Sequence, residues 1–235
     1  MLIVLNNKSN FNKKGYQEYL QHLKRIDFRN HTVVLCPSSP YFILTESDEI
    51  YLGSQNVSKN SYGSHTGEVS AEQLKSLGVS YCLVGHSERR YEEQESIEDI
   101  NKKIMCLLKN EISPILCIGE TASEREGNRT TERINSELTK IIDSIPQEYL
   151  KKIIIAYEPV WAIGSGIIPT AEQINGSIQT IKKLLPGNKV LYGGSLNEKN
   201  IATLLNIEID GYLVGNLSLN PEKLNEFILN KNIVN

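Results

Sequence analysis

Glu158 is the side chain whose position in this sequence most clearly predicts chemistry. It follows the apolar run 153–157, which is typical of a strand buried on both faces, and it precedes Pro159, which cannot continue a sheet ladder. The segment 159–166 contains Trp161 and two glycines, a composition that predicts a movable loop. An acid at the end of a buried strand beneath such a lid suits proton abstraction in a closed site, because closure strips water from the carboxylate and makes it a better proton acceptor.

His86, Lys8 and Asn6 are the side chains predicted to complete the reacting centre. His86 follows an apolar run, and residues 87–89 have the composition of a short helix start. Backbone N–H groups at that helix start are expected to face the imidazole and disfavour its cation, which leaves a neutral ring that can donate to a carbonyl oxygen. Lys8 follows the apolar run 2–6, which ends at Asn6, so an ammonium group and an amide can stabilise negative charge in the same pocket.

Three glycine-containing segments are predicted to bind a phosphate group through backbone N–H groups. Ser195 follows a Gly-Gly pair after one apolar run, Gly215 and Asn216 follow another, and Gly164 lies in the predicted lid. Loops and short helix starts of this kind bind phosphate in many enzymes. A Gly-Gly pair also occurs in ordinary tight turns, so it is a weak signal by itself.

Four stretches of the sequence together resemble the motifs of the triosephosphate isomerase family. They are LNNK at 5–8, VGHSERR at 84–90, IIIAYEPVWAIGSG at 153–166 and LYGGS at 191–195. They occur in the order of that family and at consistent spacing, and they extend over nearly the whole chain. Four such matches are far more specific than any one of them.

The resemblance implies a (β/α)8 barrel that interconverts dihydroxyacetone phosphate and D-glyceraldehyde 3-phosphate through an enediolate, as a step of glycolysis and gluconeogenesis. In that family a carboxylate base works with a neutral imidazole, so the roles of Glu158 and His86 rest on the resemblance as well as on their positions. It also implies that Glu88 contacts Lys8. Arg89 is expected to form a supporting ion pair or a helix-start contact. No metal or organic cofactor is expected, because the substrate carbonyl itself accepts the electron pair.

The sequence departs from the family pattern at a few positions. Leu5 and Asn7 stand where glycine and tryptophan are usual, which puts the local packing in question but keeps the Asn-x-Lys pair. Asn216 replaces a usual glycine; asparagine tolerates left-handed backbone geometry better than most residues, and its N–H remains available. Ser165 replaces a usual threonine, which is a small polar exchange.

The segment 55–70 resembles the loop that members of the family insert into a partner subunit, with Thr66 at its tip. A long polar loop is costly to order on a monomer, so a homodimer through this loop is expected, and a flexible surface loop is the alternative.

Strand and helix signals alternate along the chain about eight times, which predicts one α/β domain, a single (β/α)8 TIM barrel over residues 1–235. The predicted strands are 2–6, 32–36, 50–54, 81–84, 114–118, 152–157, 189–192 and 211–214, of which 50–54 has the weakest pattern. Capping boxes at Ser70 and Thr170 and an Asn-Pro start at Asn220 mark helix N-termini. A doubly wound open sheet is the alternative. A GxGxxG motif after the first strand would favour it, but this sequence reads LNNKSN there.

Composition excludes several other classes of protein. The net charge of −3 gives no global attraction to nucleic acid or an anionic membrane, so local groups must hold an anionic substrate. The four cysteines, Cys36, Cys82, Cys106 and Cys117, have neither zinc-site nor disulfide-framework spacing and fit a reducing, cytoplasmic environment. The apolar run at the N-terminus is too short for a signal peptide or a membrane span.

Two alternative functions remain open from the sequence. One is an isomerase of another phosphosugar, against which the lid with Glu158 and the HSERR segment argue. The other is a catalytically inactive barrel that acts as a binding or scaffold protein, because a fold alone does not fix a function. Loss of Lys8, His86 or Glu158 is the expected mark of such a protein, and all three are present.

Overall fold

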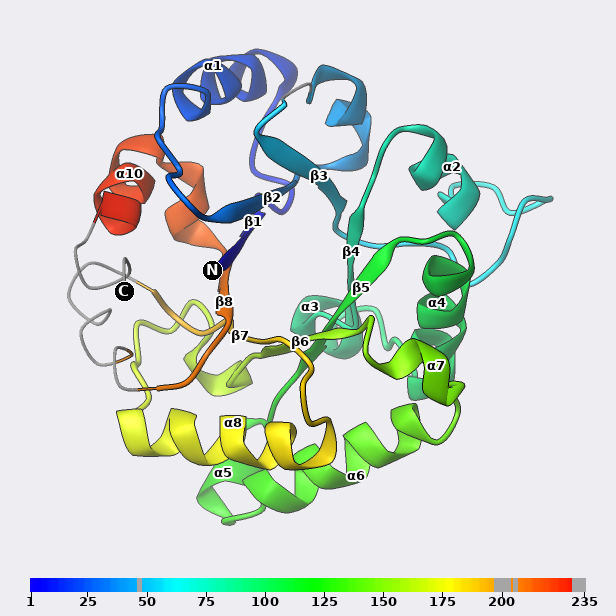
Figure 1. Ribbon diagram of the computed structural model, residues 1–235, viewed down its shortest axis with the longest axis vertical. Coiled ribbons are helices and arrows are strands. Elements are labelled where there is room, and N and C mark those ends of the chain that lie inside the picture. Colours follow the sequence, from blue (N-terminus) through cyan, green and yellow to red (C-terminus); the bar gives the residue numbers. More distant parts are fainter. Residues whose placement is uncertain (46–47, 197–203, 205–206, 230–235) are drawn as a thin grey trace.

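Eight parallel strands close into a barrel in the computed structural model, which describes residues 1–45, 48–196, 204 and 207–229 (Figure 1). Each strand pairs with its neighbours in chain order, and β1 pairs with β8 to close the ring. The predicted barrel is therefore confirmed and the open sheet is wrong. The strands are β1 (Leu2–Asn6), β2 (Thr32–Cys36), β3 (Ile50–Ser54), β4 (Tyr81–Val84), β5 (Ser113–Ile118), β6 (Ile154–Tyr157), β7 (Val190–Tyr192) and β8 (Gly211–Val214).

Helices surround the barrel as an outer ring (Figure 1). The α-helices are α1 (Lys13–Leu23), α2 (Ala71–Ser76), α3 (Ser87–Tyr91), α4 (Ile97–Lys109), α5 (Ala122–Glu126), α6 (Thr130–Ile142), α7 (Gln147–Leu150), α8 (Ala171–Leu184) and α10 (Pro221–Leu229). Short 3-10 helices are η1 (Ser39–Leu44), η2 (Val160–Ala162) and η3 (Asn216–Leu219). None of the helices in the described part of the chain is both long and apolar enough to cross a membrane.

The helices begin at the residues that the sequence indicates. Ser70 and Thr170 accept hydrogen bonds from the backbone N–H groups three residues on, and Gln73 and Gln173 bond back to complete both capping boxes. The Asn220 side chain accepts from the backbone N–H of Lys223 at 3.0 Å and caps α10. These bonds satisfy N–H groups that the first helical turn leaves without a backbone partner.

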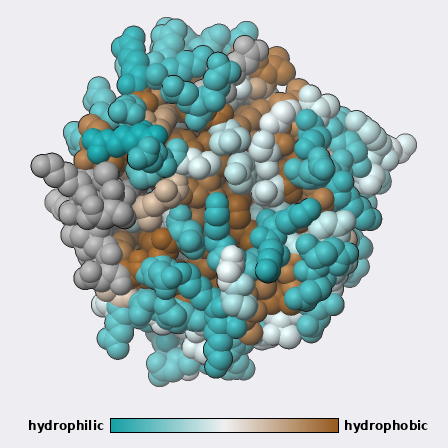
Figure 2. All heavy atoms as spheres, in the orientation of Figure 1, coloured by the Kyte–Doolittle hydropathy of each residue, from teal (hydrophilic) through white to brown (hydrophobic). Residues whose placement is uncertain are grey.

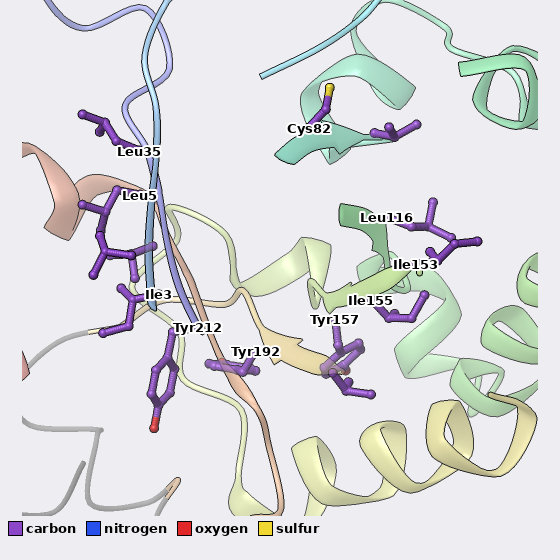
Figure 3. Packing of buried hydrophobic residues seen from close by; sticks show 14 of the residues in the cluster. Ile3, Leu5, Leu35, Cys82, Leu116, Ile153, Ile155, Tyr157, Tyr192 and Tyr212 are labelled. Carbon is purple, nitrogen blue, oxygen red and sulfur yellow. The ribbon is translucent and has the colours of Figure 1, made fainter. Parts of the chain in front are cut away.

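Alternate residues along each strand pack into two separate apolar layers. Side chains such as Val4, Val34 and Ile115 fill the barrel interior. Their neighbours, including Ile3 and Leu35, pack in the layer between the strands and the surrounding helices (Figure 3). Because both faces of most strands are buried, these strands read as continuous apolar runs rather than as alternating patterns. In β3 the Tyr51 side chain is exposed, which fits the weaker pattern of that strand.

Hydrophilic and hydrophobic side chains both occur on the face shown in Figure 2. Hydrophilic side chains cover most of its periphery, and hydrophobic ones lie between them towards the middle, where the barrel strands run.

The interior is tightly filled even where a glycine lies in a strand. A Cβ on Gly53 of β3 would lie only 2.5 Å from the Cys36 sulfur and 2.7 Å from a Val34 methyl carbon.

Candidate active site

All eight predicted site residues line one cavity of about 320 Å³. They come from loops that follow β1, β4, β6, β7 and β8, segments far apart in the sequence that barrel closure brings to the same mouth. The eight are Asn6, Lys8, His86, Glu158, Gly164, Ser195, Gly215 and Asn216. The structure therefore brings together every residue that the sequence singled out for the site.

Glu158 and His86 face each other directly in this cavity. A carboxylate oxygen of Glu158 lies 3.3 Å from Nε2 of His86, and only 3% of Glu158 and 5% of His86 is exposed. The backbone N–H of Glu158 donates to the Ile118 carbonyl at 2.7 Å, which holds the residue at the end of the barrel wall. Two groups that can each take up and release a proton are thus held within hydrogen-bonding reach of each other and away from bulk water.

The first turn of α3 determines which nitrogen of His86 faces the cavity. His86 is the N-cap of α3, and its Nδ1 accepts a hydrogen bond from the backbone N–H of Glu88 at 3.3 Å. An amide donor can bond only to the ring nitrogen that lacks a proton. The contact therefore assigns the neutral tautomer with its proton on Nε2, the nitrogen beside Glu158, as the predicted helix start implies.

Lys8 has a strained backbone and a fixed charge partner. Its φ is 51°, in the left-handed region that a non-glycine residue rarely adopts. Its ammonium nitrogen lies 2.5 Å from a carboxylate oxygen of Glu88, and its backbone N–H donates to the Asn6 side chain at 3.1 Å. The backbone carbonyl of Lys8 accepts hydrogen bonds from the Ser38 hydroxyl and the Gln55 side-chain amide, and these bonds hold the backbone bend in place. The expected contact between Glu88 and Lys8 is present.

Arg89 differs from the expectation of an ion pair or a helix-start contact. Its Nε is buried and has no hydrogen-bond partner in the part of the chain that the structure describes. Its backbone carbonyl does accept from the N–H of Glu95 at 3.0 Å, which stabilises the turn after α3.

The segments predicted to hold phosphate follow β6, β7 and β8, whereas His86 follows β4. A Cβ on Gly193 would stand 3.0 Å from Cγ of Glu158, so a side chain there would require the Glu158 side chain to shift. The Ser195 hydroxyl donates to the Ala162 carbonyl at 2.6 Å, which ties this loop to the base of the lid. Gly215 is the N-cap of η3, so the first N–H groups of that helix lie at the cavity wall.

The structure corrects one expectation for Asn216. Its backbone is not among those with positive φ, so its tolerance for left-handed geometry is not used. Asn216 instead begins η3 in an ordinary helical conformation, which any L-residue adopts.

The lid residues have the conformations expected of a hinged loop with an anchored end. Gly164 and Gly166 have φ values of 66° and 75°, which glycine adopts at little cost. Trp161 donates its indole N–H to a carboxylate oxygen of Glu120 at 2.9 Å. Ile163 and the two glycines line the cavity from the lid side.

Glu120 lies outside the cavity lining but anchors the lid through Trp161, and the sequence did not indicate this role. It is fully buried, and the Tyr157 hydroxyl also donates to it, at 3.1 Å. Burial raises the pKa of Tyr157, with the Glu120 carboxylate as a second cause, so the phenol remains a neutral donor. Glu120 is the second residue after β5 and Glu158 is the first after β6, and that position near a strand end was the available signal.

The structure shows how Asn7 packs at a position where the family usually has tryptophan. It is buried, and its amide N–H₂ lies 3.3 Å from both the Tyr19 hydroxyl and the Ser218 hydroxyl. Ser218 in turn donates to the Asn6 carbonyl at 3.4 Å. A polar chain thus joins the end of β1 to η3. Leu5, the other departure at this strand, packs fully buried against the helices.

Apolar residues that sequence reasoning did not assign form much of the remaining cavity wall. The Cys117 thiol lies near the Glu158 carboxylate. Burial raises the pKa of this thiol, and the Glu158 carboxylate is a further cause. No periodic pattern distinguishes such wall residues from ordinary core residues. The wall residues are Leu196, Leu213, Val214 and Leu217.

Comparison with known proteins agrees with this geometry. Residues 1–231 match the family described as triosephosphate isomerase. Triosephosphate isomerases of Francisella tularensis subsp. mediasiatica and Francisella philomiragia are each 35% identical over 241 residues, covering 97% of this chain and 95% of theirs. The triosephosphate isomerase of Ruthia magnifica is 38% identical over 208 residues, covering 83% of this chain and 84% of its own. Matched over nearly its whole length, this chain belongs to the triosephosphate isomerase family.

Proposed function

We propose that this protein interconverts dihydroxyacetone phosphate and D-glyceraldehyde 3-phosphate by proton transfer between adjacent carbons. One observation supports the mechanism most directly: the 3.3 Å approach of Glu158 to His86 Nε2, in a cavity that Lys8 and the phosphate-binding loops also line. A base, a neutral proton donor and a cation around one small cavity are the groups that an enediolate reaction requires.

Glu158 acts as the base and His86 moves protons between the oxygens. Glu158 takes a proton from the carbon beside the carbonyl, and the electron pair passes to the carbonyl oxygen. His86 donates its Nε2 proton to that oxygen and recovers a proton from the neighbouring hydroxyl. Glu158 then returns its proton to the other carbon, which completes the isomerisation. Lys8 and the Asn6 amide stabilise the negative charge while it exists.

The phosphate group of the substrate is held by backbone N–H groups of Gly164, Ser195, Gly215 and Asn216. These groups are fixed dipoles, so they bind the anion without rearranging during the reaction. Because Gly164 belongs to the lid, phosphate binding favours lid closure. A closed lid excludes water, which protects the enediolate from losing its phosphate.

A substrate panel tests this function against the other two. Purified protein is assayed on D-glyceraldehyde 3-phosphate and on five-carbon aldose phosphates, with product formation followed by a coupled dehydrogenase. Rapid conversion of the triose phosphate alone is expected. Preferred conversion of a five-carbon substrate contradicts the proposal, and a folded protein without turnover supports the scaffold alternative. Glu158→Gln prepared in the same way controls for a contaminating host isomerase.

We also propose that the protein works as a homodimer joined by the 55–70 loop. Residues 61–68 are all exposed, and Tyr62 presents two-thirds of its surface to solvent at 67%. An exposed tyrosine within a long polar loop suits burial against a partner. The resemblance of Thr66 and its neighbours to the family's intersubunit loop supports the same arrangement.

The remaining proposals concern organisation and location. Residues 1–235 are proposed to form one domain, because the strands follow one another around the barrel in chain order. A cytoplasmic location is proposed because the cysteines are free thiols, and Cys36, Cys82 and Cys117 are buried as small core residues, which suits a reducing compartment.

A further inference from the structure

We propose that Arg90 is a positioning residue for His86, an inference that rests on the isomerase mechanism proposed above. Arg90 touches neither the cavity nor the reacting groups. It lies behind the bend that carries His86, with 9% of its side chain exposed. Its role follows from what its guanidinium group holds.

The guanidinium group of Arg90 donates to two backbone carbonyls on neighbouring segments of the barrel. Its Nε donates to the carbonyl of Gly85, the residue directly before His86. A terminal nitrogen donates to the Cys117 carbonyl, on the neighbouring strand β5, at 2.8 Å. One planar group therefore joins the ends of β4 and β5, and a planar fork sets direction more strictly than a point charge does.

The bend at Gly85 packs directly against this guanidinium group. Gly85 has a φ of 68°, and a Cβ there would stand 2.8 Å from a terminal nitrogen of Arg90. The guanidinium thus packs against the Gly85 backbone itself. The backbone N–H of Arg90 also donates to the His86 carbonyl at 3.1 Å. His86 is held through both of the peptide units that flank it.

Glu137 of α6 is the charge partner of Arg90. The carboxylate of Glu137 forms an ion pair with Arg90 and is 1% exposed. Burial raises the pKa of Glu137, while Arg90 and Arg133 act in the opposite direction. Arg133 pairs with the same carboxylate at 3.0 Å but does not contact Gly85. The chain thus contains two arginines with a shared partner, only one of which reaches His86.

This difference gives the experiment its matched control. Arg90→Lys keeps the positive charge beside Glu137 but loses the fork that bonds both carbonyls. Arg133→Lys makes the same change on the other side of Glu137. We expect Arg90→Lys to lower kcat about tenfold with KM within about twofold, because a misdirected imidazole slows chemistry more than binding. Arg133→Lys is expected to keep the kcat of the wild-type protein.

A second measurement separates this inference from the proposed function. The ¹⁵N resonances of the His86 ring report its tautomer and hydrogen bonds whether or not the protein turns over triose phosphate. In Arg90→Lys these resonances are expected to move, and in Arg133→Lys they are expected to stay. Unchanged resonances and kcat in Arg90→Lys overturn the inference, and so does an equal loss of kcat in both variants. Absence of isomerase activity in the wild type overturns the proposed function instead.

Glu137→Gln provides the test if Arg90→Lys does not fold. It removes the charge partner but leaves both carbonyl contacts of Arg90 in place. The inference predicts a kcat within about twofold of wild type and unchanged His86 resonances, since the carbonyl contacts carry the effect. A large loss of kcat in Glu137→Gln assigns the effect to the charge pair and contradicts the role of the carbonyl contacts.

Discussion

At the scale of single residues, the proposed chemistry depends on polar side chains that follow apolar, buried runs of strand residues. Glu158 and His86 each follow such a run, and both lie in the cavity. Glu120 follows one too, but its partner Trp161 lies 41 positions away, so its contact depends on the neighbouring strands being paired. The bonds of Asn7 to Ser218 span 211 positions and have no local signal at all.

His86→Gln tests the proton transfer at this scale. Glutamine keeps a hydrogen-bonding group but cannot pass a proton between two oxygens. Loss of a general acid–base group is expected to lower kcat by about 10²-fold or more, with KM changed far less. Steady-state kinetics give both constants. The control is His22→Gln on the exposed face of α1, which is expected to match wild type; wild-type turnover in His86→Gln removes His86 from the mechanism.

At the scale of elements, the sequence predicted all eight strands because burial on both faces makes each a short apolar run. Three boundaries moved by one or two residues: β5 begins at Ser113, β6 at Ile154 and β7 at Val190. Lys152 and Lys189 are outside their strands, since pairing with neighbours, and not composition, determines where a ladder begins. The capping boxes located the helix starts well because they are local.

Gly164→Ala tests the lid as an element. Nothing lies within 4 Å of the added Cβ, so the cost comes from the left-handed backbone alone, about 1 kcal/mol. If that strain displaces the lid N–H, binding of inorganic phosphate is expected to weaken about fivefold. Trp161, the one tryptophan of the chain, reports the titration through its fluorescence.

Gly187→Ala is the matched control for the lid variant. Gly187 has a φ of 86° and also has open space around its Cβ, but it lies after α8, outside the cavity. Both variants are expected to lose similar thermal stability, and only Gly164→Ala is expected to lose phosphate affinity. Identical phosphate titrations for the two variants contradict a role of the Gly164 N–H in binding.

At the scale of the whole molecule, barrel closure is what converts dispersed residues into a site. Pairing of β1 with β8 brings Lys8 and Gly215 to one cavity wall, although they are separated by most of the chain. The sequence predicts that Lys8 and Gly215 lie together only because it predicts the fold class, since active sites of such barrels lie at the carboxyl ends of the strands. It did not predict the cavity's apolar wall or the Arg90 contacts, which depend on side-chain packing between strands.

Thr66→Arg tests the proposed dimer. A bulky charge at the tip of the intersubunit loop is expected to halve the mass measured by sedimentation velocity, because an unpaired charge is costly in a buried interface. Ser136→Arg on the exposed surface of α6 serves as the control and is expected to remain dimeric. A wild-type protein that sediments as a monomer at micromolar concentration refutes the proposed assembly.

The most direct test of the mechanism is the turnover of Glu158→Asp. The shorter side chain withdraws the carboxylate by about 1 Å without removing its charge, so kcat is expected to fall on the order of 10²-fold. Competitive inhibition by inorganic phosphate is expected to stay at the wild-type level, because the phosphate loops are untouched, and Glu148→Asp on the surface controls for the exchange itself. Wild-type kcat in Glu158→Asp would contradict the assignment of this carboxylate as the base.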